Sequence, residues 1–352
     1  MSPVMLDRNE NQYGPSPGCY QVLRKADLEH LSLYSRSFLS GIKSQLSARL
    51  ARDIGIPEER VLLSYGSEDM LKQTVHCYLQ PGQTLLLPRQ SWWYYKSVAA
   101  EVLGSQVAYD LHVGDDRFDY DADEIIGLYE KHRPAVILIA SPNNPTGNSI
   151  DAGALHRVTG HCQESVIVLD QAYHGFAEGR QEDVNALLNS HPSIVVLRTF
   201  SKYYALAGLR IGYACVGTGL GRLIAYSARY LGYNRLSEEI ALAALDDESY
   251  YRSISRRMKE DLDTMHAIFA GVEGFTPFRS DANFLLIRFP GELKTTLQEG
   301  LRQNGVVVKF LDDPGLTDCM RITIGTREQN GLTIAAFQKV INEVRTPSPT
   351  QA

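Results

Sequence analysis

Several features are scarce in this sequence, and each scarcity argues against a class of protein. The five cysteines are scattered without CxxC spacing and the nine histidines lack HExxH spacing, so neither a disulfide framework nor a metal site is expected. The 35 lysines and arginines are outnumbered by 41 acidic residues, and a net charge of -6 argues against nucleic-acid or membrane-surface binding. No apolar run approaches the ~18 residues of a membrane span, and residues 1–10 lack a signal-peptide core. We therefore expect a cytoplasmic globular protein.

The composition is that of a folded chain, since 44% of the residues are hydrophobic. A length of 352 residues exceeds the ~250–300 at which one core usually stops growing, so about two domains are expected. Apolar spacing from Gly41 through Leu50 to Ile54 predicts a helix. Short apolar runs, with helical stretches between several of them, recur at Val61–Leu63, Thr84–Leu87, Ala135–Ala140, Val166–Leu169, Ile194–Leu197 and Ile211–Val216. This alternation predicts an α/β fold with a mostly parallel sheet covered by helices on both faces.

The pattern changes after about residue 245. A long charged helix, Tyr250 to Phe269, leads into apolar runs at Phe284–Phe289, Val306–Phe310 and Arg321–Ile324. These features predict a smaller α+β domain. We expect residues 41–250 to form the large domain and residues 251–352 the small one, with residues 1–40 as an N-terminal arm that belongs to the small domain and to a dimer contact.

The most informative segment is RTFSKYYALAGLRIGY, residues 198–213. Lys202 comes just after a predicted strand, at the place where open α/β sheets bind ligands. The hydroxyls of Thr199 and Ser201, together with Arg210, would suit one phosphate. Lys202 would serve there as a point charge or as a Schiff-base nucleophile. The alternative is a surface lysine that follows a strand by accident.

Three further segments carry polar groups next to predicted elements. SPNNPTG, residues 141–147, follows a strand and is either a ligand loop or a plain tight turn. Asp170 closes a strand and Tyr173 follows it, so they line a cleft, or Asp170 caps a helix. Ser67 and Glu68 begin a helix whose free N–H groups suit a phosphate, although an ordinary N-cap explains them too. Together the four segments match pyridoxal phosphate, which presents a phosphate, an aldehyde, a ring nitrogen and a ring oxygen.

The sequence resembles the fold-type-I pyridoxal-phosphate aminotransferases, and among them most closely the histidinol-phosphate aminotransferases. The resemblance covers nearly the whole chain. Its segments, in family order, are LDRNENQYGPSP, SPNNPTG, DQAY, TFSKYYALAGLRIGY, SDANFLLIRF and CMRITIGTREQ. It implies that pyridoxal 5'-phosphate is the cofactor, that the fold has a large and a small domain, and that the enzyme is an aminotransferase of amino-acid biosynthesis.

The resemblance also implies roles for individual residues. Lys202 corresponds to the lysine that forms the Schiff base and carries the proton, Asp170 to the partner of the pyridine nitrogen, and Tyr173 and Asn144 to ligands of the ring 3-hydroxyl. The implied phosphate ligands are Ser67, Glu68, Thr199, Ser201 and Arg210. The ring-stacking aromatic falls on Trp93, with Trp92 as the second choice.

For the substrate, the resemblance implies that Arg321 binds the α-carboxylate, that Asn144 also contacts the substrate, and that Tyr13 lies near the substrate phosphate. Tyr34 corresponds to a tyrosine that reaches the cofactor phosphate of a neighbouring subunit. The implied assembly is therefore an obligatory homodimer with shared active sites.

Four departures lie where substrate is recognised. The chain has Gln12 in a segment that usually reads NPYG, Gln171 in place of Glu, GYNRLS for a proline-rich segment, and SRSFLSG without the customary proline. The expected reaction moves an amino group from histidinol phosphate, an aromatic amino acid or a similar amine to 2-oxoglutarate. One alternative is a decarboxylase, lyase or cyclase that uses the same cofactor. Another is a regulatory binding protein, which would need an appended pair of DNA-binding helices that the sequence does not predict.

Overall fold

The computed structural model describes residues 3–177, 183–229 and 231–345. Its larger sheet has seven strands in the order β2-β10-β9-β8-β7-β3-β4. In that order they span Val61–Ser64, Gly212–Val216, Ile194–Thr199, Val166–Asp170, Val136–Ala140, Thr84–Pro88 and Ser105–Tyr109. All neighbouring pairs are parallel except the two made by β10, which runs antiparallel to both β2 and β9. The mostly parallel α/β sheet is confirmed.

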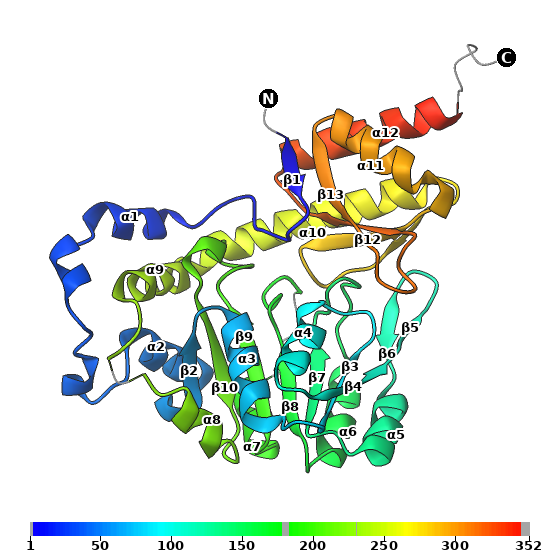
Figure 1. The fold of residues 1–352 in the computed structure, drawn as a ribbon. Coiled ribbons are helices and arrows are strands. Elements are labelled where there is room, and N and C mark those ends of the chain that lie inside the picture. The colour runs from blue at the N-terminus through cyan, green and yellow to red at the C-terminus, as the bar shows by residue number, and fades with distance from the viewer. Residues whose placement is uncertain (1–2, 178–182, 230, 346–352) are drawn as a thin grey trace.

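Helices cover both faces of this sheet, as Figure 1 shows. One face packs against α3 (Ser67–Tyr78), α4 (Tyr94–Glu101) and α8 (Gly221–Tyr226). The other packs against α2, α5, α6 and α7, which span Gln45–Ile54, Ala122–His132, Ala152–His161 and Val184–Ser190. Burial from both sides explains why β7 and β8 are apolar at nearly every position.

The smaller sheet has five strands in the order β1-β13-β14-β12-β11. They span Val4–Leu6, Val306–Phe310, Cys319–Thr323, Phe284–Arg288 and Thr276–Phe278. Strand β1 pairs in parallel with β13, so the first residues of the chain add a strand to the C-terminal sheet. This sheet packs with α10 (Glu248–Ala270), α11 (Lys294–Gln303) and α12 (Arg327–Arg345).

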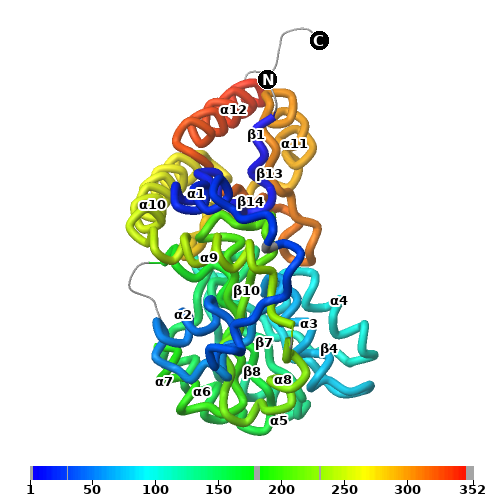
Figure 2. The backbone as a smooth tube through the Cα atoms, turned by 90° about the vertical axis from the view of Figure 1, so that its left-hand side faces the viewer, coloured from blue at the N-terminus to red at the C-terminus, as the bar shows by residue number. Residues whose placement is uncertain are grey.

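The arm descends from the small sheet along the large one, as Figures 1 and 2 show. After β1 it forms α1 (Pro17–Lys25), which packs against α9 (Arg235–Asp246). Two 3₁₀ turns, Leu28–Ser32 and Ser37–Ser40, lead to α2. A short hairpin of β5 (Leu111–Val113) and β6 (Phe118–Tyr120) and two further 3₁₀ turns, Glu58–Arg60 and Gly291–Leu293, complete the connections outside the site.

The sequence prediction differs from the structure at several elements. The helix expected from Gly41 begins at Gln45, because the hydroxyl of Ser44 accepts the main-chain N–H of Ser47 and caps it there. Strands β1, β4, β5, β6 and β11 were not predicted, being short or half-exposed and so without a clear apolar run. Within the described residues, every helix is too short or too polar to cross a membrane.

Candidate active site

Three of the predicted cofactor residues lie at the carboxyl ends of β7, β8 and β9, at the edge of the large sheet that faces the small sheet (Figure 1). Asp170 is the last residue of β8, Lys202 comes three residues after the end of β9, and Asn144 comes four after the end of β7. The register pairs Asp170 with Ala140 on one side and with Leu197 on the other. Parallel strands end at the same edge, and for that reason separate loops deliver these side chains to one place.

Lys202 is half-buried in the loop after β9. Its Nζ donates a hydrogen bond to the main-chain carbonyl of Arg8 (2.9 Å) and lies 5.9 Å from the centre of the Tyr173 ring. Burial, with a further contribution from the positive charge of Arg321, lowers the pKa of Lys202 from 10.5 to about 8. About a tenth of the amine is therefore unprotonated at pH 7, far more than for an ordinary lysine, and able to attack a carbonyl carbon.

Asp170 is buried at the end of β8. One carboxylate oxygen accepts from the Tyr95 hydroxyl (2.9 Å) and the other from the main-chain N–H of Ala172 (2.9 Å). Burial raises the pKa of Asp170, although both hydrogen bonds oppose the shift. Among the described residues it forms no ion pair. A cationic ring nitrogen would therefore supply the charge partner that a buried carboxylate requires.

The start of α3 forms an anion site together with the loop after β9. Its first N–H groups, at Ser67 and Glu68, receive no side-chain cap. Arg210 donates to Ser201 Oγ (3.4 Å) and lies 3.5 Å from the carboxylate of Glu68. The hydroxyl of Thr199 donates to Ser201 Oγ (2.9 Å). These hydroxyls, N–H groups and one guanidinium are the donors that a phosphate needs.

Two glycines make this anion site compact. Gly66 has φ +83°, and a Cβ on it would lie 2.6 Å from Nη2 of Arg210. A Cβ on Gly212 would lie 2.5 Å from the main-chain nitrogen of Ser67. Larger residues would therefore push Arg210 and β10 away from the helix start.

Arg321 faces the site from β14 of the small sheet and is 8% exposed. Its Nη1 donates to the side-chain oxygen of Asn144, and its Nη2 to the main-chain carbonyl of Asp7 (2.6 Å). Its buried Nε has no hydrogen-bond partner within the described chain. Burial lowers the pKa of Arg321 because water is removed from the cation. A buried guanidinium with a free donor suits a carboxylate.

Tyr173 lies between the two sheets. Its oxygen accepts a hydrogen bond from Asn9 Nδ2 (2.8 Å), and its ring meets Phe284 edge-on at 5.2 Å. Burial raises the pKa of Tyr173, so the phenol stays protonated. The predicted cofactor residues Lys202, Asp170 and Tyr173 are therefore brought together.

The two tryptophans before α4 differ in environment. Trp93 is 65% exposed, whereas Trp92 is partly buried and its ring meets Tyr95 edge-on at 5.7 Å. Tyr95 also binds Asp170, so Trp92 lies one contact away from that carboxylate. Trp93 keeps an exposed ring face and stays the predicted stacking residue, with Trp92 as the second choice.

The predicted site residues Tyr34 and Tyr13 have surroundings that differ from those of Lys202 and Asp170. Tyr34 lies between the two 3₁₀ turns of the arm and is 70% exposed in the single chain. Tyr13 is half-buried, and its carbonyl accepts from the Tyr250 hydroxyl of α10 (3.3 Å). Burial, and to a lesser degree the nearby Asp261 carboxylate, raises the pKa of Tyr13. The contacts described for Tyr13 lie on the α10 side of the arm and do not include Lys202, Asp170 or Arg321.

Sequence reasoning missed three residues at this site. Tyr95 and Asn9 are uncharged and lie far along the chain from the groups they contact. Lys309 pairs directly with Arg321 in the β13–β14 register, which places the two cations on one face of the small sheet. The sequence offers one signal for Lys309, which is the single charged residue in the apolar run Val306–Phe310.

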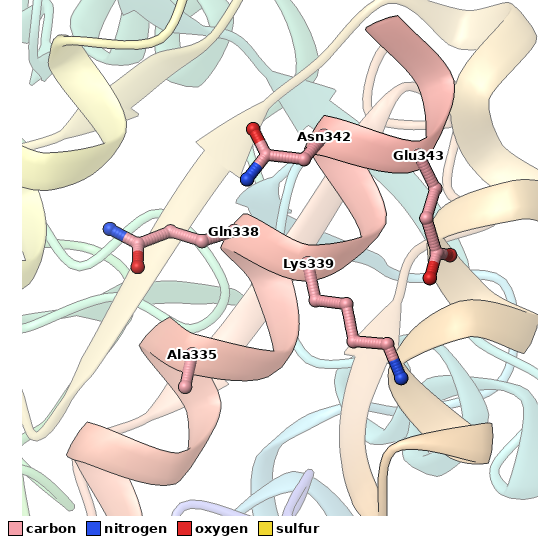
Figure 3. Close-up of a pocket in the computed structure, with 5 residues that line it drawn as sticks. All are labelled: Ala335, Gln338, Lys339, Asn342 and Glu343. Atoms are coloured by element: carbon pink, nitrogen blue, oxygen red, sulfur yellow. The ribbon is translucent and has the colours of Figure 1, made fainter. Parts of the chain in front are cut away.

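A separate surface hollow lies on α12 and is shown in Figure 3. Its lining residues all come from that one helix: Ala335, Gln338, Lys339, Asn342 and Glu343. None of the predicted site residues lines it. Ligand sites usually combine polar groups from several elements, as do the residues around Lys202.

Comparison with known proteins shows the family of this chain. The sequence profile of aminotransferase class I and II matches residues 3–337. A histidinol-phosphate aminotransferase of Ruminiclostridium cellulolyticum is 31% identical over 94% of this chain and 90% of its own, and one of Roseiflexus castenholzii is 30% identical over 96% and 89%.

Solved structures share the fold at lower identity. A histidinol-phosphate aminotransferase of Sinorhizobium meliloti in complex with pyridoxal 5'-phosphate has a TM-score of 0.86 at 23% identity, covering 97% of this chain and 92% of that one. An L-threonine-O-3-phosphate decarboxylase of Porphyromonas gingivalis has a TM-score of 0.79 at 18% identity, covering 96% and 99%. The predicted fold type, the aminotransferase assignment and the cofactor class are confirmed. The chain belongs to the aminotransferase class I and II family.

Proposed function

We propose that this enzyme transfers an amino group between histidinol phosphate, or a related anionic amine, and 2-oxoglutarate. One observation carries the proposal. Lys202 and Asp170 lie at or just after the ends of neighbouring strands, the hydrogen-bond donors around Arg210 lie on one side of them, and Arg321 lies on the other. Pyridoxal phosphate, when bound, supplies the electron withdrawal that makes the substrate Cα–H acidic. Three features of the described residues fit that group: a buried carboxylate that has no ion pair among them, a start of α3 that no side chain among them caps, and a lysine with a lowered pKa.

Each residue on the cofactor side has a defined task in this proposal. Lys202 would hold the cofactor covalently and would move the substrate proton, and its lowered pKa favours both roles. Asp170 would hold the positive charge at the ring nitrogen, Tyr173 and Asn144 would bind the 3-oxygen, and Trp93, with Trp92 as the second choice, would cover the ring face. The phosphate ligands are the N–H groups of Ser67 and Glu68 with the side chains of Thr199, Ser201 and Arg210.

On the substrate side, Arg321 binds the α-carboxylate of glutamate or 2-oxoglutarate through a bidentate contact. Its Nη groups contact Asn144 and Asp7, and we propose that a carboxylate takes the free Nε and displaces one of these contacts. Lys309 is exposed beside it and would bind a second anionic group. One cation would thus serve both the distal carboxylate of 2-oxoglutarate and the phosphate of the amine. Tyr13 is proposed as a further phosphate ligand.

We propose a homodimer whose contact includes the arm. Six large apolar side chains are exposed within residues 28–39: Leu28, Leu31, Leu33, Tyr34, Phe38 and Leu39. A cluster of this kind on one chain is typical of an interface. In the dimer Tyr34 would reach the partner's cofactor phosphate. Sedimentation at micromolar concentration tests this, since a monomeric parent protein would contradict it.

The five cysteines are free and buried, which supports the proposed cytoplasmic location, where thiols stay reduced. The domain division at residues 40 and 250 is likewise proposed. It places β1 and the arm with the small domain, in keeping with the pairing of β1 and β13.

The reaction is tested by adding L-histidinol phosphate to the cofactor-loaded protein, with glutamate and aromatic amino acids in parallel. Conversion of the cofactor to its amine form, with release of the matching aldehyde or oxo acid, is expected for histidinol phosphate and for glutamate. Release of CO₂ or of an eliminated group would instead identify a decarboxylase or lyase, an activity for which this fold also serves in the Porphyromonas enzyme.

A further inference from the structure

Asn9 is held against the small sheet by contacts to its main chain. The residue is 1% exposed, and its φ of +56° lies in the left-handed region that asparagine tolerates better than most residues. Its N–H donates to Thr323 Oγ1 (2.9 Å) at the end of β14, and its carbonyl accepts from Asn283 Nδ2 (3.2 Å) just before β12. The backbone of Asn9 therefore has a single, fully bonded position.

The side chain of Asn9 crosses from the small sheet to the large domain. Its Oδ1 accepts from the Thr323 hydroxyl (3.2 Å), and its Nδ2 donates to the oxygen of Tyr173 (2.8 Å). An amide nitrogen only donates, so the phenol oxygen is the acceptor in this contact. A phenol has one hydrogen, and Tyr173 therefore retains it for another acceptor.

The ring of Tyr173 is also fixed in place. Phe284 packs against it edge-on, and burial raises the pKa of Tyr173, which keeps the hydroxyl hydrogen present. Under the proposed function, the nearby acceptor in the cleft is the 3-oxygen of pyridoxal phosphate. A hydrogen bond to this oxygen stabilises the negative charge that it carries.

We propose that Asn9 is a positioning residue, held by Thr323, which turns the Tyr173 hydroxyl hydrogen toward the 3-oxygen of the bound cofactor. The proposal rests on the proposed function. Thr323 belongs to the small sheet and Asn283 lies next to it, whereas Tyr173 belongs to the large domain. The packing of the small sheet against the large domain therefore sets the direction in which the Tyr173 hydroxyl points. Asn9 acts through Tyr173 and needs no contact with substrate or cofactor.

The test replaces Asn9 by a group of the same shape that only accepts, Asn9→Asp. A carboxylate would take the Tyr173 hydrogen and withdraw it from the 3-oxygen. Loss of a hydrogen bond to a charged oxygen should raise the pH midpoint of the visible absorbance of the bound cofactor by about 1 unit or more. Asn11→Asp is the matched control, because Asn11 is a buried residue of the same arm whose Nδ2 donates to the Tyr203 carbonyl (3.0 Å).

Asn9→Asp also adds a negative charge near the cofactor. Making it in a Tyr173→Phe background separates the effect of that charge from the effect of turning the Tyr173 hydroxyl. With no hydroxyl to turn, Asn9→Asp should shift the midpoint by less than half as much. An unchanged midpoint for Asn9→Asp, or an equal shift in both backgrounds, would overturn the proposal.

Thr323→Val provides a charge-neutral second variant, which decides the question if Asn9→Asp does not fold. It removes the hydroxyl that orients the Asn9 amide, so a smaller shift in the same direction is expected, and no shift would contradict the proposal. A parent protein whose visible band is absent, or survives in Lys202→Ala, would contradict the proposed function itself and the proposal with it.

Discussion

The two halves of the proposed site are supplied by the chain in different ways. The cofactor half comes from residues directly after neighbouring strands, with Asn144 after β7, Asp170 at the end of β8 and Lys202 after β9. The substrate half joins Arg321 and Lys309 of the C-terminal sheet to the N-terminal segment around residues 7–13. Parallel strands with short loops create the first half by topology alone. The second half exists only because β1 pairs with β13, some 300 residues away in sequence.

This comparison predicts that substitutions in the cofactor half lower the rate for every substrate, whereas substitutions in the substrate half lower it for some substrates and not for others.

The largest effect is expected at Lys202. Lys202→Ala should abolish covalent attachment of pyridoxal phosphate and lower kcat by about 10³-fold or more, because nucleophile and proton carrier are lost together. Absorbance and initial rates measure both. Lys259→Ala, which removes an exposed lysine of α10, serves as the control, and a visible band that persists in Lys202→Ala would refute the assignment.

The next largest effect is expected at Asp170, again for all substrates. Asp170→Asn keeps the shape of the side chain but removes the charge that holds a protonated ring nitrogen, and kcat should fall about 10²–10³-fold. Tyr95→Phe removes only one hydrogen bond to this carboxylate and should cost a few-fold at most. Equal losses in the two variants would show that the charge of Asp170 is not what matters.

In the substrate half, Arg321→Ala should weaken the binding of glutamate and 2-oxoglutarate by about 1.5–3 kcal/mol, the value of a lost charged hydrogen bond. This corresponds to a rise in KM of roughly 10–150-fold. Steady-state kinetics with each substrate would show the difference. An unchanged KM for glutamate would remove Arg321 from this role, and an equal loss for an amine without a carboxylate would point to a structural defect.

The cofactor half also predicts a pH dependence of loading. Because the pKa of Lys202 is lowered to about 8, the rate of attachment should rise about tenfold per pH unit below pH 8 and level off above it. The direction follows from the need for an unprotonated amine, which is the minor form below the pKa. Stopped-flow mixing of the apo protein with pyridoxal phosphate measures this rate. A rise that continues to pH 10, as for an ordinary lysine, would contradict the prediction.

The smallest effect is expected at Lys309, which is exposed and so contributes a screened charge. Lys309→Ala should raise KM for histidinol phosphate and 2-oxoglutarate about two- to fivefold and leave KM for a neutral aromatic amino acid nearly unchanged. Lys339→Ala, on the outer helix α12, is the control. Equal changes for charged and neutral substrates would exclude the proposed anion contact.

The sequence determined much of the large domain and of the cofactor half, because both depend on local order. Apolar runs interrupted by helices predicted six of the seven strands of the large sheet. The exception is β4, because its residues are mostly exposed or half-buried at the sheet edge. The residues next to strand ends predicted Lys202, Asp170 and Asn144. The register of the family motif placed the ring-stacking aromatic at Trp93, with Trp92 as the second choice, and this stays a prediction.

The tertiary structure alone decided the contacts that join distant segments. The antiparallel direction of β10, the placement of β1 beside β13, and the pairing of Lys309 with Arg321 follow from hydrogen-bond register between strands, which local composition does not report. The hydrogen bonds from Asn9 to Tyr173 and from Tyr95 to Asp170 each have an uncharged donor that lies more than 70 positions from its acceptor. The physical reason is that a sequence pattern records which face of an element is buried, whereas the partner of each buried polar group depends on how the elements pack.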